Sequence, residues 1–272
     1  MRLGLRSKAL EELIGGYEPG KIYHFYGHAG TGKTHLACYH PLSALSPRLT
    51  EAMRNDERVI AVIYSCDGSF DWGRFFDIYG GGFGERPELK RYVQVVRPVD
   101  FDHQHSLIVK TLPAFLESRG LTPVFIAVDP MTSFYRIEFM TTKDPKKRYS
   151  IALKRTGDLE QQLSVLKAIA EKYECPVVVT NWIKSNDADK DQPWYREFGG
   201  GKGFEFYPSV SVRLEEIYKR PKIVKATVTK HRFGEEGRSC YFTIDCMGVR
   251  DLNEEEKRLV EKLEKKIGGE SP

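Results

Sequence analysis

The sequence lacks the features that would place it in a membrane or in an oxidising compartment. No apolar run approaches the roughly 18 residues that a transmembrane helix needs. The start of the chain, Met1–Lys8, contains no apolar segment typical of a signal peptide. The five cysteines are scattered and form no Cys-x-x-Cys pair, which argues against a disulfide or zinc framework. We therefore expect a cytoplasmic protein without membrane contact.

Two further absences limit the function. The net charge of +4 is too small to indicate a polyanionic partner, so the local distribution of charge has to decide. The sequence contains no internal repeat, which excludes a tandem two-copy ATPase. The 272 residues, of which 40% are hydrophobic, suffice for one large or two small domains.

A glycine-rich segment with the pattern of a phosphate-binding loop follows the strand-like run Ile22–Tyr26. The residues after it contain no helix breaker, so the context is strand, loop and helix. In that context the backbone N–H groups of the loop and the helix N-terminus together bind phosphate. We predict a nucleoside triphosphate, ATP, bound by Gly27, His28, Ala29, Gly30, Thr31, Gly32, Lys33, Thr34 and His35.

The pattern of apolar runs predicts an α/β fold with a mainly parallel central sheet flanked by helices. The expected buried strands are Ile22–Tyr26, Val59–Ser65, Tyr92–Val96, Val124–Val128 and Val177–Thr180. Their hydrophobicity is continuous rather than alternating, as in strands that are covered on both faces. After about Val210 the residues alternate, which predicts antiparallel C-terminal strands. We expect a single core over residues 1–252 and a short charged C-terminal helix over 253–272.

Two carboxylates are candidates for the chemistry of ATP. Asp129 closes the apolar strand that begins at Pro123, where a phosphate-loop ATPase needs an acid for its Mg²⁺ shell, with Thr34 as the second metal ligand. Asp67 follows the strand Val59–Ser65 and is the candidate that activates water, with Lys33 as the catalytic cation. The alternatives are an ordinary strand end at Asp129 and a turn residue before glycine at Asp67.

Several short motifs between about Ser7 and Val249 carry a family likeness. They are the lead-in Ser7–Gly20, Asp67–Phe70 with Arg74, Asp129–Phe139, Thr180-Asn181 followed by Gly199-Gly200, and Thr229–Phe233. In this order and spacing they resemble the motifs of the RecA/RadA recombinase family, especially its archaeal RadA paralogs (RadB-like proteins).

The resemblance implies a RecA-like core that binds ATP, Mg²⁺ and DNA. It places Arg74 beside the adenine and Asn181, or its neighbourhood, near the γ-phosphate. Lys230 and Arg232, at alternate positions of one expected strand, are implied to contact the ATP of a neighbouring subunit, as arginine fingers do. Solvated basic side chains remain the alternative for Arg74, Lys230 and Arg232.

The sequence also departs from the family pattern. Asp67 stands where the family has glutamate, which is one methylene longer, and Pro130 stands where it usually has serine. About 20 residues precede the first strand, too few for the helical N-terminal domain and polymerisation linker of RadA. We therefore expect an accessory paralog that forms no long filament.

Two segments correspond to the DNA-binding loops of the family. The first, from Arg136 to about Gly157, carries Lys143, Lys146, Lys147, Arg148, Lys154 and Arg155. The second, from Trp182 to Gly199, has no net basic charge but contains Trp194 and Tyr195, which could stack on bases. A solvated charged loop and aromatic packing against the core are the alternatives.

The resulting hypothesis is a RadA paralog that binds ATP and single-stranded DNA in recombinational repair. It would have weak, Mg²⁺-dependent and DNA-dependent ATPase activity, and the RadA recombinase would be its partner. Two alternatives stay open. One is a KaiC-like regulatory ATPase, and the other is a nucleotide-gated interaction module with negligible hydrolysis, suggested by Asp67.

Overall fold

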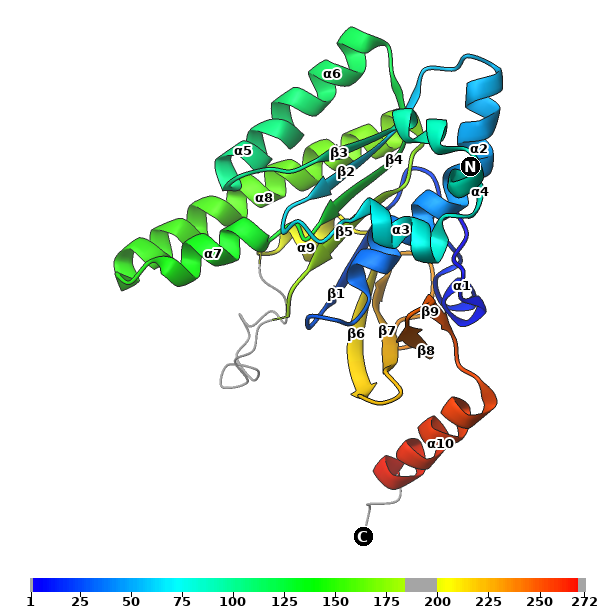
Figure 1. The fold of residues 1–272 in the computed structure, drawn as a ribbon. Helices are drawn as coiled ribbons and strands as arrows, with labels where there is room; N and C mark the ends of the chain where they lie inside the picture. Colours follow the sequence, from blue (N-terminus) through cyan, green and yellow to red (C-terminus); the bar gives the residue numbers. More distant parts are fainter. Residues whose placement is uncertain (1, 184–199, 269–272) are drawn as a thin grey trace.

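The computed structural model describes residues 2–183 and 200–268. In this part of the chain, nine strands form one sheet in the order β3-β2-β4-β5-β1-β6-β7-β8-β9 (Figure 1). The strands are β1 (Ile22–Gly27), β2 (Val59–Ser65), β3 (Val93–Val96), β4 (Thr122–Asp129), β5 (Val177–Asn181), β6 (Val210–Tyr218), β7 (Ile223–His231), β8 (Ser239–Asp245) and β9 (Gly248–Asp251).

The first six strands in this order of the sheet are parallel, and the last three continue it in antiparallel fashion. This confirms the predicted fold class. β2 and β5 are buried over their whole length, including the polar residues Ser65, Thr180 and Asn181 that follow their apolar runs. The short strand β9 was not predicted from the sequence.

Helices cover both faces of the sheet. They are α1 (Lys8–Ile14), the π-helical turn η1 (His35–Tyr39), α2 (His40–Arg54), α3 (Trp72–Tyr79), α4 (Gly81–Glu85), the 3₁₀ turn η2 (Pro87–Tyr92), α5 (Phe101–Ser106), the π-helical turn η3 (Leu107–Thr111), α6 (Leu112–Arg119), α7 (Ser133–Thr141), α8 (Pro145–Tyr173), α9 (Gly203–Phe206) and α10 (Glu254–Gly268). None of the helices among the described residues is long and apolar enough to span a membrane.

Two apolar cores lie on opposite faces of the sheet, because successive strand residues point in opposite directions. On β4, Phe125 and Ala127 join the core beneath α1–α4. Ile126 and Val128 join the core beneath α6 and α8. The carboxyl ends of the parallel strands are thereby held at one edge of a rigid three-layer core.

The segment expected to be the first DNA loop is helical instead. α8 begins at Pro145 because the side chain of Asp144 accepts hydrogen bonds from the N–H groups of Lys146 and Lys147. Together with α7 it forms a helical hairpin that projects from the body of the protein (Figure 1). We call this element, residues 133–157, the α7–α8 hairpin.

The chain ends in α10, whose start is fixed by reciprocal bonds. Asn253 Oδ1 accepts from the N–H of Glu256, and Glu256 Oε2 accepts from the N–H of Asn253. Tyr241 donates its hydroxyl to Glu264, which connects the helix to β8.

Candidate nucleotide-binding site

The glycine-rich loop between β1 and η1 depends on glycine at several positions. Gly30 and Gly32 have φ values of +78° and +89°, a region that other residues rarely adopt. At Gly27 a Cβ atom would lie 2.4 Å from the carbonyl oxygen of Leu214 on β6. The loop is therefore fixed against the sheet in a conformation that only this glycine pattern permits.

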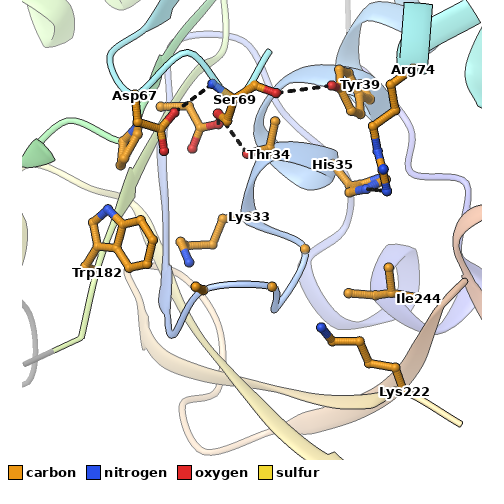
Figure 2. A pocket seen from close by; sticks show the side chains of 15 residues that line it. Lys33, Thr34, His35, Tyr39, Asp67, Ser69, Arg74, Trp182, Lys222 and Ile244 are labelled. Atoms are coloured by element: carbon orange, nitrogen blue, oxygen red, sulfur yellow. Dashed lines mark hydrogen bonds between the residues drawn. The ribbon is translucent and has the colours of Figure 1, made fainter. Parts of the chain in front are cut away.

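A cavity of about 440 Å³ opens beside the loop, within the size range of small-molecule sites (Figure 2). Its walls come from the loop, the ends of β2, β4 and β5, helix α3 and the antiparallel strands. The lining residues are Ala29, Gly30, Gly32, Lys33, Thr34, His35, Tyr39, Asp67, Ser69, Arg74, Asp129, Pro130, Trp182, Lys222 and Ile244.

Lys33 lies at the centre of the cavity wall. Its Nζ donates hydrogen bonds to the carbonyl oxygens of Gly27 (2.9 Å) and His28 (2.6 Å). Burial lowers the pKa of Lys33 to about 8, while the negative charges of Asp129 and Asp67 act in the opposite direction. Lys33 is thus a mainly charged ammonium group below that pH, beside the N–H groups that would cradle phosphate.

Oxygen atoms of three side chains meet at the end of β4. The Thr34 hydroxyl donates to Ser69 Oγ at 3.3 Å, and Ser69 Oγ donates to Asp129 Oδ2, also at 3.3 Å. Burial raises the pKa of Asp129, and a hydrogen bond from Thr180 opposes this effect. Mg²⁺ prefers oxygen ligands and usually keeps water and phosphate in its shell. One carboxylate and two hydroxyl groups in a cavity fit such an ion.

Asp67 lines the same cavity and also stabilises a turn. Its Oδ1 accepts a hydrogen bond from the N–H of Ser69 at 2.9 Å, across Gly68 with φ of +75°. The turn role that the Asp-Gly sequence suggested is therefore present, and it leaves the exposed carboxylate facing the cavity.

Arg74 reaches the cavity from α3. Its Nη2 lies 3.4 Å from His35 Nε2, and His35 Nδ1 lies 2.8 Å from the hydroxyl of Tyr79. Burial lowers the pKa of His35 to about 4, and the charge of Arg74 adds to this effect. A neutral imidazole and a guanidinium thus form the side of the cavity opposite Trp182 in Figure 2.

Comparison with known proteins decides the family. A family model described as Rad51 matches residues 1–199, more than half of the chain. The chain belongs to the Rad51 family. The predicted resemblance to RecA/RadA recombinases is confirmed.

Relatives within the family match along most of the chain. The DNA repair and recombination protein RadB of Archaeoglobus fulgidus is 30% identical over 89% of this chain and 95% of that protein. The DNA repair and recombination protein RadA of Ignicoccus hospitalis is 26% identical over 90% of this chain and 71% of that protein. A solved structure described as the crystal structure of the RadB recombinase has a TM-score of 0.66 at 24% identity. This structural match covers 92% of the present chain and 100% of the RadB chain, and it supports a shared fold.

Not every predicted nucleotide residue of this Rad51-family chain lies on the cavity surface. Gly27, His28 and Thr31 belong to the loop but do not line the cavity, and the Thr31 hydroxyl donates to the carbonyl of His28. Asn181 is buried at the end of β5, and the Thr132 hydroxyl lies 3.4 Å from its Oδ1. The next residue, Trp182, lines the cavity in its place.

One part of the prediction for Lys230 and Arg232, their position on a single strand, needs correction. Both lie beside the beginning of β6, at the edge of the sheet opposite the phosphate loop. Their side chains donate to the carbonyl oxygen of Phe206, from Lys230 at 3.1 Å and from Arg232 at 3.4 Å. Arg232 follows the end of β7, so the two residues do not alternate along one strand. Neither lines the candidate nucleotide cavity of its own chain, and action on a neighbouring subunit stays a proposal.

The predicted DNA-contacting residues differ in their exposure to solvent. Lys143, Lys146, Lys147 and Lys154 are exposed on the α7–α8 hairpin, and Arg148 is half-buried. Trp194 and Tyr195 lie outside the described residues. Arg155 does not fit the prediction, because it is buried and bonded to Asp102, Glu138 and Asp158.

Sequence reasoning missed several residues of the cavity. Ser69 lies inside the motif Asp67–Phe70 and was a detectable candidate, as a hydroxyl at the end of a strand. Trp182 directly follows Asn181, so its position was also open to prediction. Lys222 lies in the turn between β6 and β7, and Ile244 lies on β8. No local pattern signals that the pairing of these strands brings both residues to the loop.

Proposed function

We propose that this chain binds ATP, Mg²⁺ and single-stranded DNA, and that it acts as an accessory RadA paralog in homologous recombination and DNA repair. The observation that carries the proposal is the cavity in which the glycine-rich loop, Lys33 and the oxygens of Thr34, Ser69 and Asp129 converge. Membership of the Rad51 family, and relatives named as repair and recombination proteins, support the biological role.

In this proposal each residue has a chemical role. The loop N–H groups and Lys33 bind the phosphates, and Thr34 and Asp129 hold the ion directly or through water. Bound Mg²⁺ would neutralise charge on the phosphate oxygens. Asp67 would orient the attacking water, and Arg74 with His35 would face the base or ribose. The buried Thr180 hydroxyl keeps the Asp129 carboxylate oriented by donating to it.

The side chain of Asp67 favours slow hydrolysis. It is one methylene shorter than glutamate, and one of its oxygens already accepts from Ser69 N–H. Water held by this carboxylate therefore sits farther from an ideal attack position, which supports the second candidate, a nucleotide-gated interaction module. We expect Asp67→Glu to raise steady-state ATP turnover and Asp67→Asn to abolish it. A wild-type rate equal to that of a recombinase would exclude the module.

DNA binding is attributed to the exposed lysines of the α7–α8 hairpin. Lys143, Lys146, Lys147 and Lys154 can each contact a phosphate, and such contacts are independent of sequence and weaken with salt. The partner we propose is the RadA recombinase, which this protein would assist. Lys230 and Arg232 remain candidates for contacts between subunits.

Fluorescence anisotropy of a labelled single strand tests the proposal directly. Binding is measured at about 50 mM salt with ATP, with ADP and without nucleotide. Saturable binding that changes with the nucleotide is expected, and Lys33→Ala should remove the nucleotide dependence while leaving the lysines of the hairpin intact. The absence of binding under all three conditions contradicts the DNA-binding function.

A further inference from the structure

Trp182 is an aromatic side chain placed between two cations at the phosphate loop. It directly follows β5, is half-buried and lines the nucleotide cavity (Figure 2). The centroid of its ring lies 4.7 Å from Lys33 Nζ and 5.5 Å from Arg136 Cζ on α7. A lysine within about 6 Å of an indole face is attracted by the negative potential of the ring.

The same ammonium group is held by the loop itself. Lys33 Nζ donates to the carbonyl oxygens of Gly27 and His28, and the side chain is only 7% exposed. An ammonium group has three donors and no acceptor. Two donors therefore point to loop carbonyls, and the positive charge faces the ring. A triphosphate seated on the loop N–H groups would compete with these partners for the same charge.

We propose that Trp182 is a positioning residue that holds Lys33 against the loop carbonyls, and that it gives up this contact when the triphosphate binds. The inference rests on the proposed function, because it concerns the nucleotide that this cavity takes. Arg136 contacts the same ring from α7, so the indole keeps one cationic neighbour after Lys33 leaves it. Trp182 thus lowers nucleotide affinity, because it stabilises the nucleotide-free position of Lys33 on the loop carbonyls relative to the position in which Lys33 binds phosphate.

Affinity measurements test the direction of this effect. Titration with a fluorescent ATP analogue compares the wild type with Trp182→Leu, which removes the aromatic face, and Trp182→Phe, which keeps a weaker one. The cation–π contact exists only in the nucleotide-free state, so its loss favours the bound state. We expect Trp182→Leu to bind about two- to tenfold more tightly than the wild type, with an intermediate value for Trp182→Phe. Unchanged or weaker binding by Trp182→Leu overturns the proposal.

A matched control is available at the other end of β5. Lys172 Nζ lies 5.1 Å from the ring centroid of Tyr173, which precedes β5 at the edge opposite the loop. Tyr173→Leu removes a similar lysine–aromatic contact and should leave nucleotide affinity unchanged. Equal tightening in both variants would assign the effect to general stability and overturn the proposal.

Fluorescence of Trp182 provides a second readout without altering the residue. The chain has three tryptophans, and Trp72→Phe with Trp194→Phe leaves Trp182 as the only indole. We expect its emission to change on addition of ATP. Lys33→Met in this background should produce a change without nucleotide and remove the response to ATP.

The two readouts separate failure of the inference from failure of the proposed function. If the wild type does not bind ATP, the proposed function fails, while Lys33→Met still shows whether Lys33 contacts the ring. If ATP binds but Trp182 emission responds neither to ATP nor to Lys33→Met, the inference alone fails.

Discussion

Replacement of Arg155 with methionine tests the anchoring of the α7–α8 hairpin. The guanidinium joins three helices, since it donates to Asp102 on α5, Glu138 on α7 and Asp158 on α8. It also lies 4.4 Å from the ring centroid of Phe101. We expect Arg155→Met to destabilise the fold and to loosen the base of the hairpin, because it removes the cation common to these carboxylates.

The size of this destabilisation follows from how exposed the three carboxylates bonded to Arg155 are. Breaking a fully buried ion pair costs about 3–5 kcal/mol, and an exposed pair contributes about 0–1 kcal/mol. The Arg155 side chain is 7% exposed, whereas Asp102, Glu138 and Asp158 are 74%, 33% and 23% exposed. Water can therefore solvate the carboxylates once the arginine is gone. We expect a loss of about 2–3 kcal/mol in the free energy of unfolding, which corresponds to about 4–5 °C in Tm for a chain of this length.

The loss should also depend on pH. A hydrogen bond from Arg155 lowers the pKa of Asp102 below its ordinary value. A carboxyl group with a lowered folded-state pKa stabilises the fold above its unfolded-state pKa, and this contribution disappears as the pH falls through the folded-state value. The difference in Tm between wild type and Arg155→Met is therefore complete at neutral pH and shrinks below about pH 4. Thermal unfolding followed by circular dichroism across this range measures it.

Lys154→Met is the matched control, because it removes the same charge from the neighbouring, exposed position. We expect this variant to keep the wild-type Tm and to lose part of the single-strand affinity. If Arg155→Met also kept the wild-type Tm and lost affinity to the same degree, Arg155 would be a DNA contact and the anchoring role would be refuted.

Three further predictions concern the cavity and the hairpin. Gly32→Ala should abolish ATP binding in calorimetry, because an alanine is strained at the φ of +89° found there, whereas Gly157→Ala, with no atom within 4 Å, should bind normally. Lys222→Ala should raise the Kd for ATP about three- to tenfold and leave that for adenosine unchanged if Lys222 contacts phosphate; equal effects on both ligands would contradict that contact. The double variant Lys146→Ala with Lys147→Ala should lower the salt slope of single-strand binding by about 1.4, and an unchanged slope would remove both lysines from the interface.

Most of the fold follows from the sequence because the parallel strands are buried on both faces. A run such as Val59–Ser65 has no polar side chain until its end, and β2 occupies the same residues. The phosphate loop was also predictable, because its conformation depends on positive φ values that glycines within the loop itself supply. Ser69 and Trp182 were within reach, because they lie one or two residues from predicted site residues.

The first half of α8 shows where local patterns are insufficient. Residues 145–157 are rich in lysine and arginine and have no continuous apolar stripe, so they read as a charged loop. The Asp144-Pro145 pair is a helix-start signal that the sequence does contain. The rest depends on tertiary contacts, because Arg155 is buried against carboxylates from two other helices, 17 and 53 residues away in the sequence.

Strand direction explains why Lys222 was missed and why Lys230 lies far from the cavity of its own chain. β6 runs parallel to β1, so its end lies at the same edge of the sheet as the loop, and the turn to β7 carries Lys222 into the cavity. β7 then returns antiparallel and delivers Lys230 to the opposite edge. Both residues are cations near the ends of the same strand, and their charge and spacing do not distinguish them. Only the pairing of β6 with β1 does, and that pairing joins segments almost 190 residues apart in the sequence, between Tyr23 and Val210. A pattern confined to neighbouring residues therefore cannot assign a basic residue to one edge or the other, whereas the direction of a single strand pair assigns both.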